Sequence, residues 1–109
     1  QMTTTGTPRP LHPEAEVALL RTAQEALANV AKHAQATRVG VTLSFLDGEI
    51  ALDVRDDGRG FDPGESHNGD GFGLVAMRQR LEGVAGTVQI ESGPGEGTGI
   101  SARVPEARP

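Results

Sequence analysis

Cysteine, tryptophan and tyrosine are absent from this chain of 109 residues, and only three phenylalanines are present. Without cysteine there is no disulfide framework, no thiolate metal site and no cysteine nucleophile. With so few aromatic residues, the core has to be built from aliphatic side chains. A chain of this length forms one domain and buries roughly two thirds of its unfolded surface, which is enough for a single core.

Clusters of basic residues and long apolar runs are also missing. The net charge is −5, and no group of lysines and arginines supplies the basic face that a nucleic-acid groove needs. No apolar run approaches the roughly 20 residues of a membrane span, and no signal-peptide pattern is present. We therefore expect a cytoplasmic domain, itself monomeric, with no nucleic-acid partner; a longer parent protein could still be anchored in a membrane.

The segment from Pro13 to Ala36 has the pattern of a long amphipathic helix. Pro13 suits its first turn. At about 100° per residue, the predicted apolar arc holds Leu19, Leu20, Ala23, Leu27, Val30, Ala31 and Ala34. The opposite arc holds Arg21, Glu25, Asn29 and Lys32, with His33 at its edge. The alanines make the apolar arc thin, so the helix can lie close to a sheet.

Alternating apolar residues predict four strands in two hairpins. The first hairpin joins 39–45 to 50–55 through an Asp47-Gly48 turn. The second joins a strand around Val88 and Ile90 to one over 100–104. A second helix is indicated by Leu74, Met77, Leu81 and Val84, whose spacings are 3, 4 and 3.

This order of elements predicts a two-layer α/β sandwich, in which both helices cover one face of a mixed, mostly antiparallel sheet. We expect the domain to span 13–105. Residues 1–12, rich in Thr, Pro and Gly, are interpreted as a linker or a boundary, and 106–109 as a tail. Residues 62–70 lack periodicity and are expected to form a mobile loop.

The most informative stretch is Asp56-Asp57-Gly58-Arg59-Gly60-Phe61, directly after an alternating strand. The strand end fixes the Asp56 carboxylate, and the glycines let the backbone lie close against a flat ligand. A carboxylate held in this way can accept a hydrogen bond from the exocyclic amine of adenine. The alternative is a polar loop with ordinary Asp-Gly turn chemistry.

Two further features could serve the same ligand. Glu25, Asn29 and Lys32 share one helix face, where an amide oxygen can complete a Mg²⁺ shell, a carboxylate can accept a proton and a lysine can neutralise phosphate. Gly71 and Gly73 precede a helix whose N–H groups can bind an anion. The alternatives are the solvated face of an amphipathic helix and a loop of no special purpose.

Four motifs in register resemble the GHKL ATPase superfamily. The segment QEALANVAKHA at 24–34 resembles its N box, and DDGRGF at 56–61 its first glycine box. GFGL at 71–74 resembles the second glycine box, and GTGI at 97–100 the closing Gly-Thr element. The resemblance covers roughly 13–105 and implies a Bergerat fold that binds ATP and Mg²⁺.

The resemblance also implies a role for each matching residue. Asp56 would bind the adenine amine, Thr98 would lie near adenine through water, Asn29 would hold Mg²⁺, and Glu25 would lie near the γ-phosphate as a general base. Lys32 and His33 would lie by the phosphates. Gly58, Gly60, Gly71, Gly73 and Leu74 would shape the pocket. Phe72 stands where related chains often carry His, so its side-chain contact with nucleotide is in doubt while its backbone role stands.

Within the superfamily, RTAQEAL at 21–27 and MRQRL at 77–81 resemble the catalytic domain of two-component sensor histidine kinases. The likeness is to the small-lid subfamily, whose response regulators carry helix-turn-helix domains. None of His12, His33 and His67 resembles a phosphoacceptor. We therefore expect the acceptor histidine on a separate dimerisation domain, and no efficient autophosphorylation by this chain alone. The alternatives are an anti-sigma-factor serine kinase of the same fold and a regulatory module without kinase activity.

Overall fold

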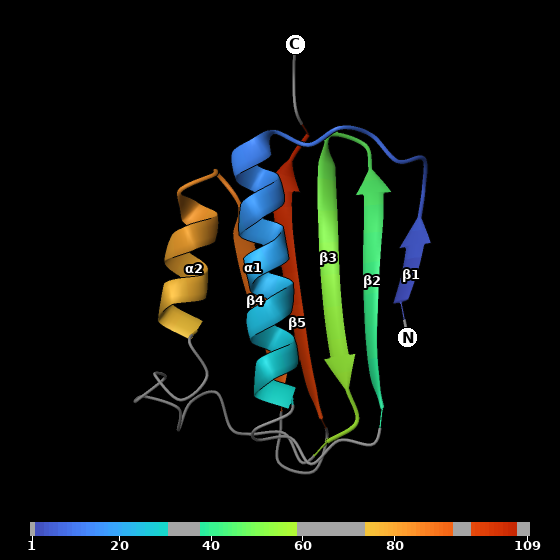
Figure 1. Ribbon diagram of the computed structural model, residues 1–109, viewed down its shortest axis with the longest axis vertical. Coiled ribbons are helices and arrows are strands. Elements are labelled where there is room, and N and C mark those ends of the chain that lie inside the picture. Colours follow the sequence, from blue (N-terminus) through green and yellow to red (C-terminus); the bar gives the residue numbers. More distant parts are fainter. Residues whose placement is uncertain (1, 31–37, 59–73, 93–96, 107–109) are drawn as a thin grey trace.

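The computed structural model describes residues 2–30, 38–58, 74–92 and 97–106 (Figure 1). In chain order the elements are β1 (Met2–Thr5), α1 (Pro13–Asn29), β2 (Val39–Leu46), β3 (Glu49–Asp56), α2 (Leu74–Glu82), β4 (Thr87–Ser92) and β5 (Thr98–Pro105). The expected loop over 62–70 and the C-terminal part of the first predicted helix lie outside the described residues.

The described strands form one sheet with the order β1-β2-β3-β5-β4. Among them only β1 and β2 run parallel, and the other neighbours are antiparallel. The predicted mixed, mostly antiparallel sheet is thereby confirmed. The strand β1 is a difference, because the sequence analysis expects a linker over these residues, whereas Met2 pairs with Val41 and Thr5 with Ser44.

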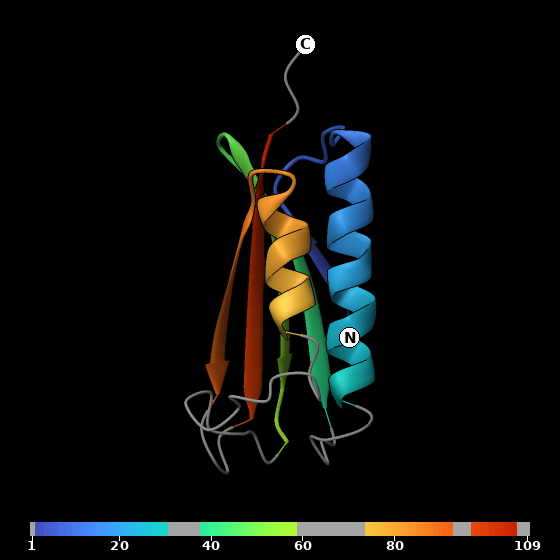
Figure 2. The same cartoon turned by 90° about the vertical axis from the view of Figure 1, so that its left-hand side faces the viewer.

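Both described helices cover the same face of the sheet (Figure 2), so the predicted two-layer sandwich is confirmed. Helix α1 packs on β3 and β5, and α2 on β4 and β5. The core is aliphatic, as the composition requires. Its most deeply buried apolar side chains, each 0–1% exposed, are Ala26, Ile50, Met77, Leu81, Ala102 and Val104. Neither described helix is long and apolar enough to cross a membrane.

Helix α1 begins where the sequence predicts, because His12 precedes Pro13 and its Nδ1 accepts a hydrogen bond from the Glu14 N–H at 3.3 Å. Its buried stripe differs from the predicted arc. The buried residues are Ala15, Ala18, Leu19, Thr22 and Ala26, whereas Leu20 is 57% exposed and Leu27 40% exposed. The prediction of Leu20 and Leu27 as core residues is therefore wrong.

The exposure of Leu20 has a physical reason in the width of the sheet. Five strands are wider than the described helices can cover, so part of β1 and β2 is left open beside α1 (Figure 1). An apolar cavity of about 430 Å³ lies there. Leu20 lines it together with Met2, Leu11, Val41 and Leu43. The small side chains Ala18 and Thr22 take the closest position against the sheet layer instead, with the Thr22 hydroxyl donating to Ala18 O at 2.8 Å.

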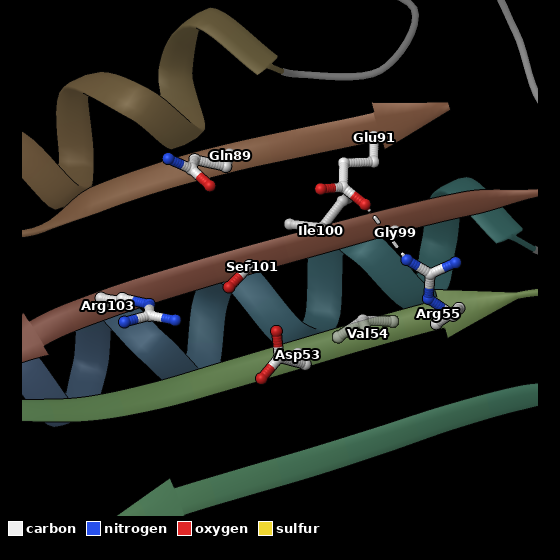
Figure 3. A pocket seen from close by; sticks show the side chains of 9 residues that line it. All are labelled: Asp53, Val54, Arg55, Gln89, Glu91, Gly99, Ile100, Ser101 and Arg103. Atoms are coloured by element: carbon white, nitrogen blue, oxygen red, sulfur yellow. Dashed lines mark hydrogen bonds and ion pairs between the residues drawn. The ribbon is translucent and has the colours of Figure 1, made fainter. Parts of the chain in front are cut away.

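The other sheet face is polar, as the alternation predicts. Figure 3 shows side chains of β3, β4 and β5 standing on it, with the helices behind the strands. A hollow of about 210 Å³ lies among them. Arg55 reaches across Gly99 to Glu91, with an Nη2–Oε2 distance of 3.3 Å. Both side chains are more than two-thirds exposed, so this ion pair contributes little to stability.

Candidate functional site

The site is organised around Asp56, the last residue of β3. Ile50, Leu52 and Val54 point into the core at alternate positions of this strand, and Asp56 is the next position in the same series. Side chains two apart on a strand share a face, so the carboxylate faces the helix layer. The sequence pattern that buries three aliphatic residues therefore also carries a carboxylate to the edge of the core.

The Asp56 side chain has an unusual environment for a carboxylate. Asp56 is only 7% exposed, and none of the ion pairs among the described residues includes it. Its Oδ1 accepts a hydrogen bond from the Gly58 N–H at 2.8 Å. Aspartate is rarely buried without a pairing partner, which makes Asp56 the candidate ligand-binding carboxylate of this edge.

A hydroxyl pair lies beside Asp56. Thr98 is the register partner of Asp56 across β3 and β5, and Ser92 is the partner of Thr98 across β5 and β4. Ser92 Oγ donates to Gly97 O at 2.9 Å and lies 3.0 Å from Thr98 Oγ1. Either hydroxyl can donate to the other, so the pair lies next to the Asp56 carboxylate as a linked polar group.

Gly97 fixes the backbone next to the carboxylate. Its φ is +76°, and a Cβ built on it would lie 2.2 Å from Asp56 O. Both the left-handed conformation and the close approach require glycine. The chain entering β5 is thus pressed against the end of β3, which holds Asp56 and Thr98 in a fixed relation.

Helix α1 brings Glu25 and Asn29 to the site from above the sheet. They are four residues apart, so they share a face of the helix, and both are half-buried. The Glu25 carboxylate forms an ion pair with the Arg80 guanidinium of α2, through Oε1 and Nη1. Asn29 is the last residue of α1, and Leu74 is the first residue of α2.

These elements meet at one end of the molecule. In Figures 1 and 2 the C-terminal end of α1, the end of β3 and the start of β5 all lie at the lower edge. Asn29, Asp56 and Thr98 are therefore grouped at that edge, and the Gly58 N–H is bonded to Asp56. The remaining predicted site residues lie outside the described residues: Lys32, His33, Gly60, Gly71, Phe72 and Gly73.

The donor groups at this end fit a magnesium ion that arrives with a nucleotide. No cluster of three or more His, Cys, Asp or Glu residues suited to a metal occurs within 2–30, 38–58, 74–92 and 97–106. Mg²⁺ commonly keeps several waters and takes one or two protein ligands together with phosphates. One amide oxygen, such as that of Asn29, is enough under those conditions.

Two residues of this region were given no role in the site by the sequence, although Arg80 lies in the segment 77–81 that resembles sensor kinases. Ser92 is separated from Thr98 by five residues that close a hairpin, and only the strand register shows that their hydroxyls meet. Arg80 lies 55 positions after Glu25. A charge count along α2 could have flagged Arg80 as a cation on a short helix, but no spacing rule links it to α1.

Comparison with known proteins agrees with this geometry. Residues 14–108 match the family described as histidine kinase-, DNA gyrase B- and HSP90-like ATPases. The signal transduction histidine-protein kinase/phosphatase DegS of Bacillus subtilis is 38% identical over 97 residues, which are 87% of this chain and 25% of that protein. The protein of the same name from Brevibacillus brevis is 39% identical over 90 residues, 83% of this chain and 23% of its own length.

Solved structures share the fold. The histidine kinase domain of a blue-light activated histidine kinase from Erythrobacter litoralis EL346 superposes with a TM-score of 0.73 at 22% identity, covering 96% of this chain and 54% of that one. The histidine kinase AdeS of Acinetobacter baumannii gives 0.76 at 15% identity, covering 99% and 54%. The chain spans about a quarter of the length of the two DegS relatives. It belongs to the family of histidine kinase-, DNA gyrase B- and HSP90-like ATPases, and within it corresponds to the ATP-binding catalytic domain of a sensor histidine kinase.

Proposed function

We propose that this domain binds Mg·ATP at the edge formed by α1, β3 and β5, and that it donates the γ-phosphoryl group to a histidine on a separate dimerisation domain. The observation that carries the proposal is Asp56, a buried carboxylate at a strand end that faces the helix layer without an ion-pair partner among the described residues. One of its oxygens accepts from Gly58, and the other would accept from the adenine amine.

Other residues of the site have supporting roles in this proposal. Thr98 holds a water against adenine with its hydroxyl. Asn29 supplies an oxygen to Mg²⁺, which would neutralise charge on the β- and γ-phosphates. Lys32 and His33 would lie along the phosphates. Gly58, Gly60, Gly71 and Gly73 would let the backbone follow the nucleotide, with the backbone of Phe72 and Leu74.

Glu25 is proposed as the general base that accepts the proton of the attacking imidazole. Phosphoryl transfer needs little covalent chemistry from the protein, since most of the catalysis is positioning and charge neutralisation. This chain therefore contributes a rigid binding edge that positions ATP. Asp56 and Thr98 position the adenine ring, and Asn29 positions the phosphates through Mg²⁺. The acceptor histidine is supplied by another domain.

The partners follow from the same proposal. The acceptor histidine lies on a dimerisation and phosphotransfer domain, and the phosphoryl group passes on to a response regulator in the cytoplasm. The segments 21–27 and 77–81 support membership of the small-lid subfamily, whose regulators carry helix-turn-helix domains. Mixing the domain with labelled ATP and, in separate reactions, a DegS-type dimerisation domain or an anti-sigma-type partner tests this. Label on a histidine of the dimerisation domain is expected, whereas label only on a serine of the anti-sigma-type partner would contradict it.

The adenine contact is tested by Asp56→Asn. The amide cannot accept in the same charge-assisted way, so we expect ATP binding to weaken by about 1.5–3 kcal/mol, measured by isothermal titration calorimetry. The matched control is Asp53→Asn, on the same strand but on the open polar face, which should leave the affinity unchanged. Equal affinity of wild type and Asp56→Asn would remove Asp56 from the adenine site.

A further inference from the structure

The ion pair between Glu25 and Arg80 joins the two described helices, one helical turn before the Asn29 end of α1. Glu25 lies in the last part of α1, and Arg80 in the last turn of α2. Their side chains are 34% and 26% exposed. Next to them the helix interface is closed by Ala26, Met77 and Leu81, which are 0–1% exposed. The pair is therefore held by a packed interface and is not a loose surface contact.

The Glu25 carboxylate would lie close to the negatively charged phosphates of ATP. Glu25 lies one helical turn before Asn29 on the same face, so its carboxylate faces the same region that would receive the phosphates. Two negative groups within several ångströms repel one another, and the repulsion is stronger in a half-buried place than in water. A carboxylate at this point needs a cation of its own.

We propose that Arg80 is a positioning residue of the nucleotide site: its guanidinium neutralises and orients Glu25, so that the carboxylate and the triphosphate of ATP can occupy the same edge. The inference rests on the proposed function, because it assigns the phosphate end of the ligand to the Asn29 end of α1. Arg80 acts through Glu25 and does not itself contact the nucleotide. The planar guanidinium suits this role because it holds a carboxylate in a defined orientation and stays charged.

Substitution of Arg80 should weaken Mg·ATP binding through the loss of its charge, with no loss of folding. Arg80→Gln leaves Glu25 unpaired beside the phosphates, so Mg·ATP affinity should fall about fivefold, a modest value for a partly exposed pair. Affinity for adenosine, which carries no phosphate, should stay within about twofold, as expected for an uncharged ligand. In Glu25→Gln/Arg80→Gln the unpaired charge is gone, and Mg·ATP affinity should return to within about twofold of the wild type.

The experiment measures adenosine and Mg·ATP binding by calorimetry for the wild type, Arg80→Gln, Arg80→Lys and the double variant. Arg80→Lys loses the planar guanidinium but keeps the positive charge that offsets Glu25, so it should keep ATP affinity within about twofold of wild type. Arg78→Gln is the matched control, since it removes the same charge from the same helix at an exposed position, and it should have no effect. Thermal melting of each variant verifies that it is folded at the temperature of the titration.

Each other outcome overturns the inference. A double variant that stays as weak as Arg80→Gln would mean that Arg80 binds the phosphates directly. A parallel loss of adenosine and Mg·ATP affinity in Arg80→Gln would mean that the ion pair only supports packing. Unchanged Mg·ATP affinity in Arg80→Gln would mean that Glu25 is remote from the phosphates. A wild type that binds neither ligand would instead overturn the proposed function, and the inference with it.

Discussion

Asp56 shows how one polar residue turns a core strand into a binding element. The alternation that buries Ile50, Leu52 and Val54 continues for one more position and ends on a carboxylate. Gly97 then presses the neighbouring chain against this residue, with a φ of +76°. At the scale of single residues, the site depends on a carboxylate that is buried by its strand and on a glycine that leaves room for it.

Gly97→Ala should therefore be costly. An added Cβ would meet Asp56 O at 2.2 Å and would sit on a left-handed backbone, so we expect the free energy of unfolding to fall by about 2–4 kcal/mol. The control is Gly48→Ala, where φ is +75° but no atom lies within 4 Å. It should lose only about 1 kcal/mol, and urea titration of both variants measures the difference. Equal losses would show that the close approach to Asp56 is relaxed at no cost.

Asp56 and Gly58 were predicted from a strand that ends in an acidic-glycine motif, and Thr98 from the resemblance of its Gly-Thr element to the superfamily. The structure places all three at one edge. Ser92 and Arg80 could not be predicted in the same way. Their partners are set by strand register and helix packing, which no local spacing records.

Among the secondary-structure elements, helix α2 depends most clearly on packing. It has nine residues, and a helix of that length is marginal in water without tertiary packing. Its place in the fold therefore depends on Met77 and Leu81, both fully buried. Because α2 also carries Arg80, the packing of this short helix determines where the cation beside Glu25 lies.

Leu81→Ala should destabilise the domain by about 2–4 kcal/mol, because it removes a fully buried side chain and leaves a cavity. Val75→Ala on the same helix is the control, since Val75 is 60% exposed and its loss should change stability by less than about 0.5 kcal/mol. Chemical denaturation followed by circular dichroism compares them. A Leu81→Ala loss as small as that of Val75→Ala would mean that α2 contributes little to the cooperative core.

At this scale most elements were predictable from alternation and helical spacing, with differences where packing decides. The four strands of the two hairpins begin or end within a few residues of the expected positions. Strand β1 was missed because its four residues are all exposed and only Met2 is apolar. The buried face of α1 was misjudged because the helix presents Ala18 and Thr22 to the core, and Leu20 lines the open cavity.

For the whole molecule, Arg9 connects segments that are far apart in the sequence. It precedes α1, donates to the Leu46 carbonyl at the end of β2, and pairs with Glu106 at 3.1 Å. The Glu106 N–H in turn donates to Gly48 O at 3.0 Å. The chain before α1, the β2–β3 turn and the end of β5 are thus joined at the edge of the sheet opposite the site (Figure 1).

Arg9→Met should lower the free energy of unfolding by about 1–2 kcal/mol, since it removes a hydrogen bond to a carbonyl and a partly buried ion pair. The control is Arg78→Met, at an exposed position of α2, which should be neutral. Thermal melting at equal protein concentration makes the comparison, and ATP affinity should be the same in both variants. A change in ATP affinity for Arg9→Met would show that this junction is coupled to the distant site.

The direction of β5 has a practical consequence for measuring the domain. Thr98 starts this strand at the proposed nucleotide edge, and Pro105 ends it seven residues later, roughly 23 Å away at about 3.3 Å per residue. A biotin or fluorophore attached after Pro105 is thereby held at the end of the molecule remote from that edge. A sensor surface prepared in that way would present the binding edge to solution.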